Sequence, residues 1–190
     1  MLVLPVLLDS CVILPMPLCD TLMRAAEAGL YRVHFSQKIL DDATDNLVKQ
    51  GKMTNDKALY FQRMLNKYFP EAMVDVPQQL IDAMTNHPRD RHVLAAAIVA
   101  KAEVIVTENL KDFPAQDLEV WGIRAWHQDI FLTYLDEMFP DKMLQIIREQ
   151  AMALSRPPST VTELLDKLEK HNSVPNFASA IRDKMHGREF

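Results

Sequence analysis

The fold is decided first by the stretch VLPVLLD, residues 3–9. It is a short apolar run that ends directly at Asp9, and runs of this kind are typical of buried strands. The run lacks a basic start and meets Pro5 early, so we interpret it as a strand and not as a secretory signal. We therefore expect a carboxylate at the carboxyl end of the first strand.

Further strands and helices alternate along the chain. Short apolar segments predict strands at residues 33–35, 74–76, 104–106 and 123–126. Apolar residues recur at helical spacing in the intervals, with Ser36 as an N-cap and Gly29 as a C-terminal stop. An Ala-rich helix from Val93 to Ala102 follows Asp90. This alternation predicts βαβ units, which build parallel sheets.

The chain is predicted to be helical from Gln128 onward. Pro140 and Pro157-Pro158 are expected to interrupt the helices, and Thr160 with Glu163 matches a capping box. The expected fold is therefore α/β, with three α/β/α layers, a central mostly parallel sheet and a C-terminal helical extension. We place one domain at residues 1–132 and an extension at residues 133–190 that packs on the core or on a partner.

Composition narrows the class of protein. The 190 residues are 48% hydrophobic and 25% charged, as in globular proteins, and the net charge of −5 disfavours a protein coated in nucleic acid. The two cysteines, Cys11 and Cys19, are typical of a protein of the reducing cytoplasm. We expect no membrane segment. The four glycines form no phosphate-binding loop, which disfavours nucleotide-driven chemistry.

Four carboxylates are candidates for chemistry. Asp9 follows the first strand, Asp42 flanks the apolar stripe of a helix, Asp90 begins the Ala-rich helix, and Asp112 lies beyond the strand at 104–106. Each alone also fits a turn, a helix cap or a solvated position. Carboxylates that meet at strand ends repel one another unless a hard cation such as Mg²⁺ or Mn²⁺ lies between them. Such an ion promotes phosphodiester hydrolysis.

These positions lie in segments that resemble the PIN-domain nucleases, in particular the longer bacterial members related to VapC-type toxins. The resemblance extends over roughly residues 2 to 132, and the matching segments are LLDSCVIL at 7–14, SQKILDD at 36–42, DRHVLAAA at 90–97 and VTENLKDFP at 106–114.

The resemblance implies a role for each candidate residue. Asp9 and Asp90 would bind the metal directly, and Asp112 would be a further metal-binding acid. Asp42 occupies a position that usually holds Glu. Thr107 would orient a carboxylate or a water molecule, and Asn109 would help to position a water molecule.

The resemblance also implies an activity and partners. It implies a metal-dependent endoribonuclease that cleaves RNA, acts as the toxin of a toxin–antitoxin pair, is inhibited by a cognate protein antitoxin and forms a homodimer in the cytoplasm. Two departures stand out, because relatives commonly carry acids where this chain has His87-Pro88-Arg89, and because residue 42 is Asp. A catalytically inactive PIN scaffold that binds RNA or a protein partner is therefore an alternative.

Two other interpretations, a phospho-receiver domain and a zinc site, agree less well with the sequence. A phospho-receiver domain also gathers acids, a Thr and a Lys at strand ends, but the segment at 74–76 leads only to Asp75 and Pro77 instead of ending at an acceptor Asp. A zinc site at His87 and His92 lacks a Cys or a third His at metal-binding spacing.

Overall fold

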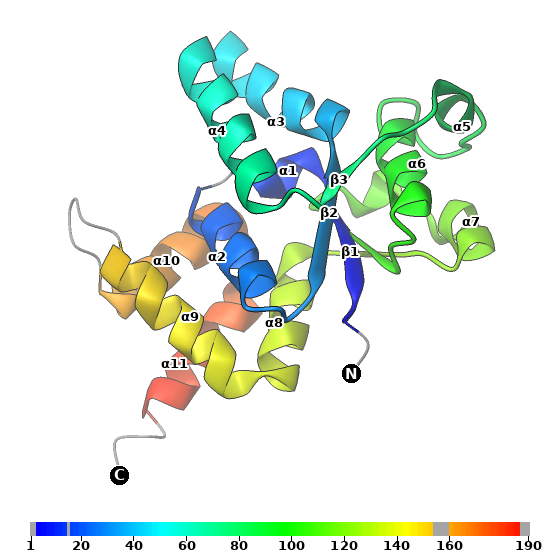
Figure 1. The fold of residues 1–190 in the computed structure, drawn as a ribbon. Coiled ribbons are helices and arrows are strands. Elements are labelled where there is room, and N and C mark those ends of the chain that lie inside the picture. The colour runs from blue at the N-terminus through cyan, green and yellow to red at the C-terminus, as the bar shows by residue number, and fades with distance from the viewer. Residues whose placement is uncertain (1–2, 15, 154–159, 187–190) are drawn as a thin grey trace. The chain divides into compact units, whose positions relative to one another are not determined.

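The computed structural model describes residues 3–14, 16–153 and 160–186, and they divide into two compact units. The first unit takes its residues from 1–14 and 31–126, and the second from 15–30 and 127–190. Figure 1 shows the course of the chain through both.

The first unit contains a five-stranded sheet in which every neighbouring pair is parallel. Its strands are β1 (Pro5–Leu8), β2 (Arg32–Ser36), β3 (Met73–Val74), β4 (Val104–Val106) and β5 (Arg124–Trp126). The spatial order is β3-β2-β1-β4-β5. The direction of the strand order therefore reverses between β1 and β4, and such a reversal opens a crevice at the carboxyl ends of the two strands.

Helical segments connect these strands. They are α1 (Ser10–Ile13), α3 (Gln37–Lys49), α4 (Asn55–Tyr68), α5 (Gln78–Asp82), α6 (Arg91–Val99), η1 (Leu110–Asp112), α7 (Ala115–Leu118) and η2 (Glu119–Trp121). Figure 1 shows α3 and α4 as neighbouring helices at one end of the sheet. The Ser36 hydroxyl accepts the amide of Ile39, and this bond starts α3 directly at the end of β2.

Helix α6 packs on the centre of the sheet, against β1, β2 and β4. Ala95, Ala96 and Ala97 are fully buried on it. Small side chains let the helix approach the strands closely, and Val6, Leu7 and Ile105 of the sheet are also fully buried. The start of α6 lies near the carboxyl end of β1, where the charges of Asp9 and Asp90 act on one another.

The second unit is a helical bundle. It consists of α2 (Met16–Glu27), α8 (Gln128–Met138), α9 (Pro140–Ala153), α10 (Val161–Asn172) and α11 (Pro175–His186). Phe131, Leu135 and Phe177 are fully buried in it, and α8 packs against both α9 and α11. A capping box joins Thr160 and Glu163 at the start of α10, as the sequence predicted.

The predicted α/β/α class is confirmed, and the central sheet is parallel throughout. One strand prediction was too long, because β3 ends at Val74 and Val76 lies outside the ladder. The predicted break at Pro157-Pro158 lies outside the described residues. The domain boundary at residue 132 stays a prediction. In the described part of the chain no helix is both long and apolar enough to cross a membrane.

Candidate metal centre

Asp9 lies at the carboxyl end of β1, where its amide donates to the carbonyl of Val106 on β4. The side chain is 3% exposed and caps the short helix α1 by accepting the Ser10 amide at 2.6 Å. The local turn expected for an aspartate at this position is therefore present. Burial of a carboxylate requires further donors, and they come from β4 and from α1.

Thr107 and Cys11 supply these donors to Asp9. The Thr107 hydroxyl donates to Oδ2 of Asp9 at 2.7 Å, and the Cys11 thiol donates to the same oxygen at 3.3 Å. Burial and the charge of Asp9 raise the pKa of Cys11 to about 12, so the thiol keeps its proton. The amide of Glu108 donates to Sγ of Cys11 at 3.3 Å. These contacts fix Asp9 between the ends of β1 and β4.

Asp90 immediately precedes α6 but does not cap it with its side chain. The ordinary explanation of an aspartate at a helix start, a hydrogen bond to the first turn, therefore does not apply here. Burial raises the pKa of Asp90, and the negative charges of Asp9 and Asp112 raise it further. Three carboxylates thus converge near the start of α6, and the ionised form of Asp90 is disfavoured by its surroundings.

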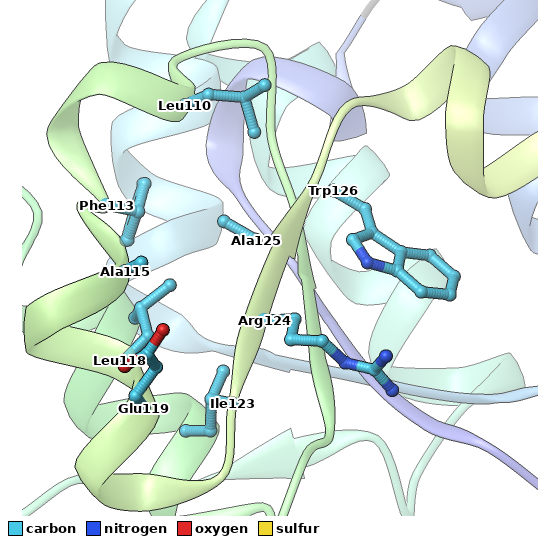
Figure 2. Close-up of a pocket in the computed structure, with 9 residues that line it drawn as sticks. All are labelled: Leu110, Phe113, Ala115, Leu118, Glu119, Ile123, Arg124, Ala125 and Trp126. Atoms are coloured by element: carbon cyan, nitrogen blue, oxygen red, sulfur yellow. The ribbon is translucent and has the colours of Figure 1, made fainter.

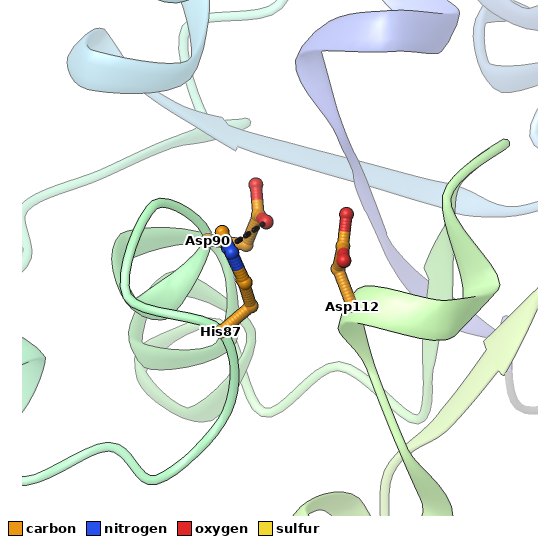
Figure 3. Close-up of side chains that lie close together, drawn as sticks. All are labelled: His87, Asp90 and Asp112. Atoms are coloured by element: carbon orange, nitrogen blue, oxygen red, sulfur yellow. Dashed lines mark ion pairs between the residues drawn. The ribbon is translucent and has the colours of Figure 1, made fainter.

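Asp112 lies on η1, and its carboxylate reaches the space in front of Asp90. One ligand atom each from His87, Asp90 and Asp112 lies within 4.8 Å of the others. Figure 3 shows these side chains extending from two different segments into the same space. The loop before α6 and the loop after β4 therefore bring together residues that are more than twenty positions apart in sequence.

Asp42 lies apart from this group of three. Its Oδ1 accepts from Lys38 at 2.5 Å, and its Oδ2 lies 3.2 Å from Nε2 of His92, within ion-pair distance but without hydrogen-bond geometry. The hydrogen bond with Asp42 is the main cause that raises the pKa of Lys38. The described contacts of Asp42 are thus with two basic side chains.

Asn109 is exposed at the start of η1. Its backbone amide donates to Oγ1 of Thr107 at 3.0 Å, and its side chain makes no capping hydrogen bond. The backbone of Asn109 therefore orients the Thr107 hydroxyl toward Asp9.

A family model of the PIN domain matches residues 5–111, more than half of the chain. The chain belongs to the PIN domain family. A second model, described as the VapC50 C-terminal domain, matches residues 128–183. The predicted resemblance to VapC-like proteins with a C-terminal extension is confirmed by these two matches.

One similar protein is named "Putative ribonuclease VapC50" and comes from Mycobacterium tuberculosis. It is 45% identical to this chain over 103 residues. The match covers 54% of this chain and 60% of the relative, so the chain spans less than two thirds of the relative's length. No solved structure gives a significant match.

The residues of this PIN domain fit a divalent cation. Asp90 and Asp112 offer carboxylate oxygens, which hard cations such as Mg²⁺ and Mn²⁺ prefer. The imidazoles of His87 and His92 act on Asp90 but leave its pKa raised. A cation would remove the repulsion that raises the pKa of Asp90. The group can therefore hold a metal ion at the carboxyl end of the sheet.

A separate cleft of about 310 Å³ lies beside β5 in the PIN domain. Figure 2 shows Phe113, Leu118 and Ile123 on one side of the strand, while Arg124 and Trp126 extend together on the other. The guanidinium of Arg124 lies 5.4 Å from the centre of the Trp126 ring. No acid of the candidate centre lines this cleft, so the cleft is separate from that group of acids.

Two neighbours of the acids in this PIN domain were not predicted from the sequence. Cys11 was considered only as typical of a protein of the reducing cytoplasm, although its position two residues after Asp9 allows contact within the first turn of α1. His87 was considered only as a zinc ligand or as extra positive charge. The proline that follows His87 favours a tight turn, and this was the available signal that His87 and Asp90 lie side by side.

Proposed function

We propose that this chain is a divalent-metal-dependent endoribonuclease and the toxin of a toxin–antitoxin pair. The observation that carries the proposal is the convergence of Asp90 and Asp112 on one space beside the strand-end residue Asp9. PIN-domain membership and the name of the similar protein support the same activity. Mg²⁺ or Mn²⁺ bound there would polarise a phosphoryl oxygen and activate a water molecule.

In this proposal the chain's own residues have distinct tasks. Asp9, Asp90 and Asp112 hold the cation, and Thr107 fixes the orientation of Asp9 through its 2.7 Å hydrogen bond. Asn109 contributes through its amide contact with Thr107, and its exposed side chain is available to orient water. Asp42 is the fourth acid of the proposed catalytic set, and its described contacts are with Lys38 and His92.

The proposal extends to organisation and partners. Residues 1–132 would carry the nuclease, and residues 133–190 would form the helical extension. The substrate is RNA, a cognate antitoxin covers the acidic site, and two copies form a homodimer in the cytoplasm. The match of residues 128–183 to the VapC50 C-terminal domain supports the helical extension, and the name of the similar ribonuclease supports an RNA substrate.

The test is cleavage of a mixed cellular RNA pool by the pure protein, with Mg²⁺ and Mn²⁺ titrated separately. The variant Asp9→Asn keeps the side-chain shape but removes the charge, and we expect it to lose cleavage by at least about 100-fold. The matched control is Asp56→Asn, which removes an exposed carboxylate from α4. Equal cleavage by wild type and Asp9→Asn would contradict the site assignment.

A second candidate function is an inactive PIN scaffold that binds RNA. It is favoured by the contacts of Asp42 with Lys38 and His92, because these leave the fourth acid outside the group of three. RNA binding without cleavage, in both metals and at all RNA lengths, would favour the scaffold over the nuclease.

A further inference from the structure

His87 reaches the acidic group because of the turn on which it lies. The amide of Asp90 donates to the carbonyl of His87 at 2.9 Å, which closes a four-residue turn with Pro88 at its second position. Proline favours this position because its fixed φ matches the turn. The closed turn brings the side chains of His87 and Asp90 to the same side, with Nδ1 of His87 3.3 Å from Oδ2 of Asp90.

The hydrogen bonds of His87 identify the nature of this contact. The amide of Arg89 donates to Nδ1 of His87 at 3.4 Å, so in this arrangement Nδ1 is an acceptor and carries no proton. Oδ2 of an ionised Asp90 is also an acceptor. Two acceptors 3.3 Å apart repel unless a proton or a metal ion lies between them. Ligands about 2.1 Å from one metal ion lie about 3.0 Å apart when they are adjacent.

Asp112 completes the arrangement from the opposite segment. Its ligand atom and those of His87 and Asp90 all lie within 4.8 Å of one another. Figure 3 shows the His87 ring beside Asp90, with the Asp112 carboxylate across the gap. The His87 side chain is 46% exposed, which leaves the site open to exchange of ions with the solvent.

We propose that the His87 imidazole is a ligand of the same cation and makes this site prefer Mn²⁺ to Mg²⁺. The inference rests on the proposed metal-dependent function. Mg²⁺ binds oxygen ligands and keeps several waters, whereas Mn²⁺, a first-row transition-metal ion, accepts an imidazole nitrogen more readily than Mg²⁺ does. The oxygens of Asp90 and Asp112 together with one nitrogen from His87 therefore shift the selectivity of the site.

A different role of His87 would have the opposite effect on Mn²⁺ binding. If His87 is protonated, its imidazolium pairs with Asp90 and competes with the metal for that carboxylate. Removal of His87 would then strengthen Mn²⁺ binding. As a ligand, His87 strengthens Mn²⁺ binding, so its removal weakens it.

The experiment uses the full chain loaded with Mn²⁺ and measures nitrogen-14 coupling to the ion by pulsed electron paramagnetic resonance. We expect a coupling in the wild type that is absent in His87→Ala. The matched control is His171→Ala, which removes an exposed imidazole from α10 and should leave the coupling intact. Calorimetry should give Mn²⁺ binding about 10-fold weaker in His87→Ala, with Mg²⁺ binding less affected. His87→Asp should move the preference toward Mg²⁺.

Other results would overturn the inference. Bound Mn²⁺ without nitrogen coupling in the wild type, a coupling that persists in His87→Ala, or tighter Mn²⁺ binding by His87→Ala would each do so. The variant Asp90→Asn separates this inference from the proposed function. If Asp90→Asn loses Mn²⁺ while His87→Ala keeps it unchanged, only the role of His87 is wrong. If the wild type binds neither ion, the proposed metal-dependent function is wrong as well.

Discussion

The two units of this protein place different surroundings around their buried and partly buried aspartates. In the helical bundle Asp129 accepts the amides of Asn176 and Phe177 and the side-chain amide of Asn176. In the PIN domain Asp90 faces other carboxylates, which raise its pKa together with burial. A buried aspartate that accepts several hydrogen bonds stabilises the fold. Aspartates that face one another repel, and a bound cation would relieve this repulsion. The difference separates Asp129, a structural acid, from Asp90, a candidate ligand.

The largest expected effect is on catalysis. Asp90→Asn and Asp112→Asn should each lower RNA cleavage by at least about 100-fold, because each removes a charge that holds the cation. Far-ultraviolet circular dichroism should stay unchanged. Asp45→Asn, which removes an exposed carboxylate from α3, should cleave like the wild type. If Asp90→Asn and Asp112→Asn both cleaved RNA at the wild-type rate, the facing aspartates of the PIN domain would have no role in catalysis.

The second expected effect is on stability in the bundle. Asp129→Ala should lower the free energy of unfolding by about 2–4 kcal/mol, because the amide of the fully buried Phe177 loses its acceptor. Denaturant unfolding measures the change. Asp183→Ala, at an exposed position of α11, should change stability by less than about 0.5 kcal/mol. Similar losses in the two variants would mean that Asp129 has no special structural role.

A smaller effect is expected where Asp136, which is 2% exposed, pairs with Lys184. Burial raises the pKa of Asp136, and the contact with Lys184 opposes that shift. Lys184→Met should therefore cost about 1–3 kcal/mol of unfolding free energy, since a buried charge loses its partner. Arg182→Met removes a cation that pairs with the exposed Asp166 and Glu169, and should cost less than about 1 kcal/mol. The reverse ranking would contradict the role of burial.

Much of the fold was predictable because local patterns agree with the tertiary structure. The apolar run before Asp9 and the segment at Val104–Val106 form strands that pair side by side. The caps at Ser36 and Thr160 were recognised from residue type alone. Val76 was wrongly included in a strand, because only Met73 and Val74 find partners on β2. Pairing of an edge strand depends on its neighbour, which the alternation of residues does not specify.

The candidate site was predictable only in part. The positions of Asp9 and Thr107 follow from their strands, since both lie at carboxyl ends of neighbouring strands. The contact of Asp42 with His92 did not follow, because His92 belongs to α6 and meets α3 only through packing of the two helices. The contact of His87 with Asp90 depends on a turn. The backbone hydrogen bond that closes this turn brings the two side chains to the same side.

The most direct test of the central claim is thermal unfolding of the wild type and Asp90→Asn at about pH 7.5, with and without Mn²⁺. The raised pKa of Asp90 means that its charge destabilises the metal-free fold as the pH rises through that pKa. Without Mn²⁺ the variant should therefore be slightly more stable, by less than about 1 kcal/mol. With Mn²⁺ the order should reverse, because only the wild type gains binding energy. A variant that is less stable without the metal, or a wild type that gains nothing from Mn²⁺, would contradict the claim that these aspartates form a cation site.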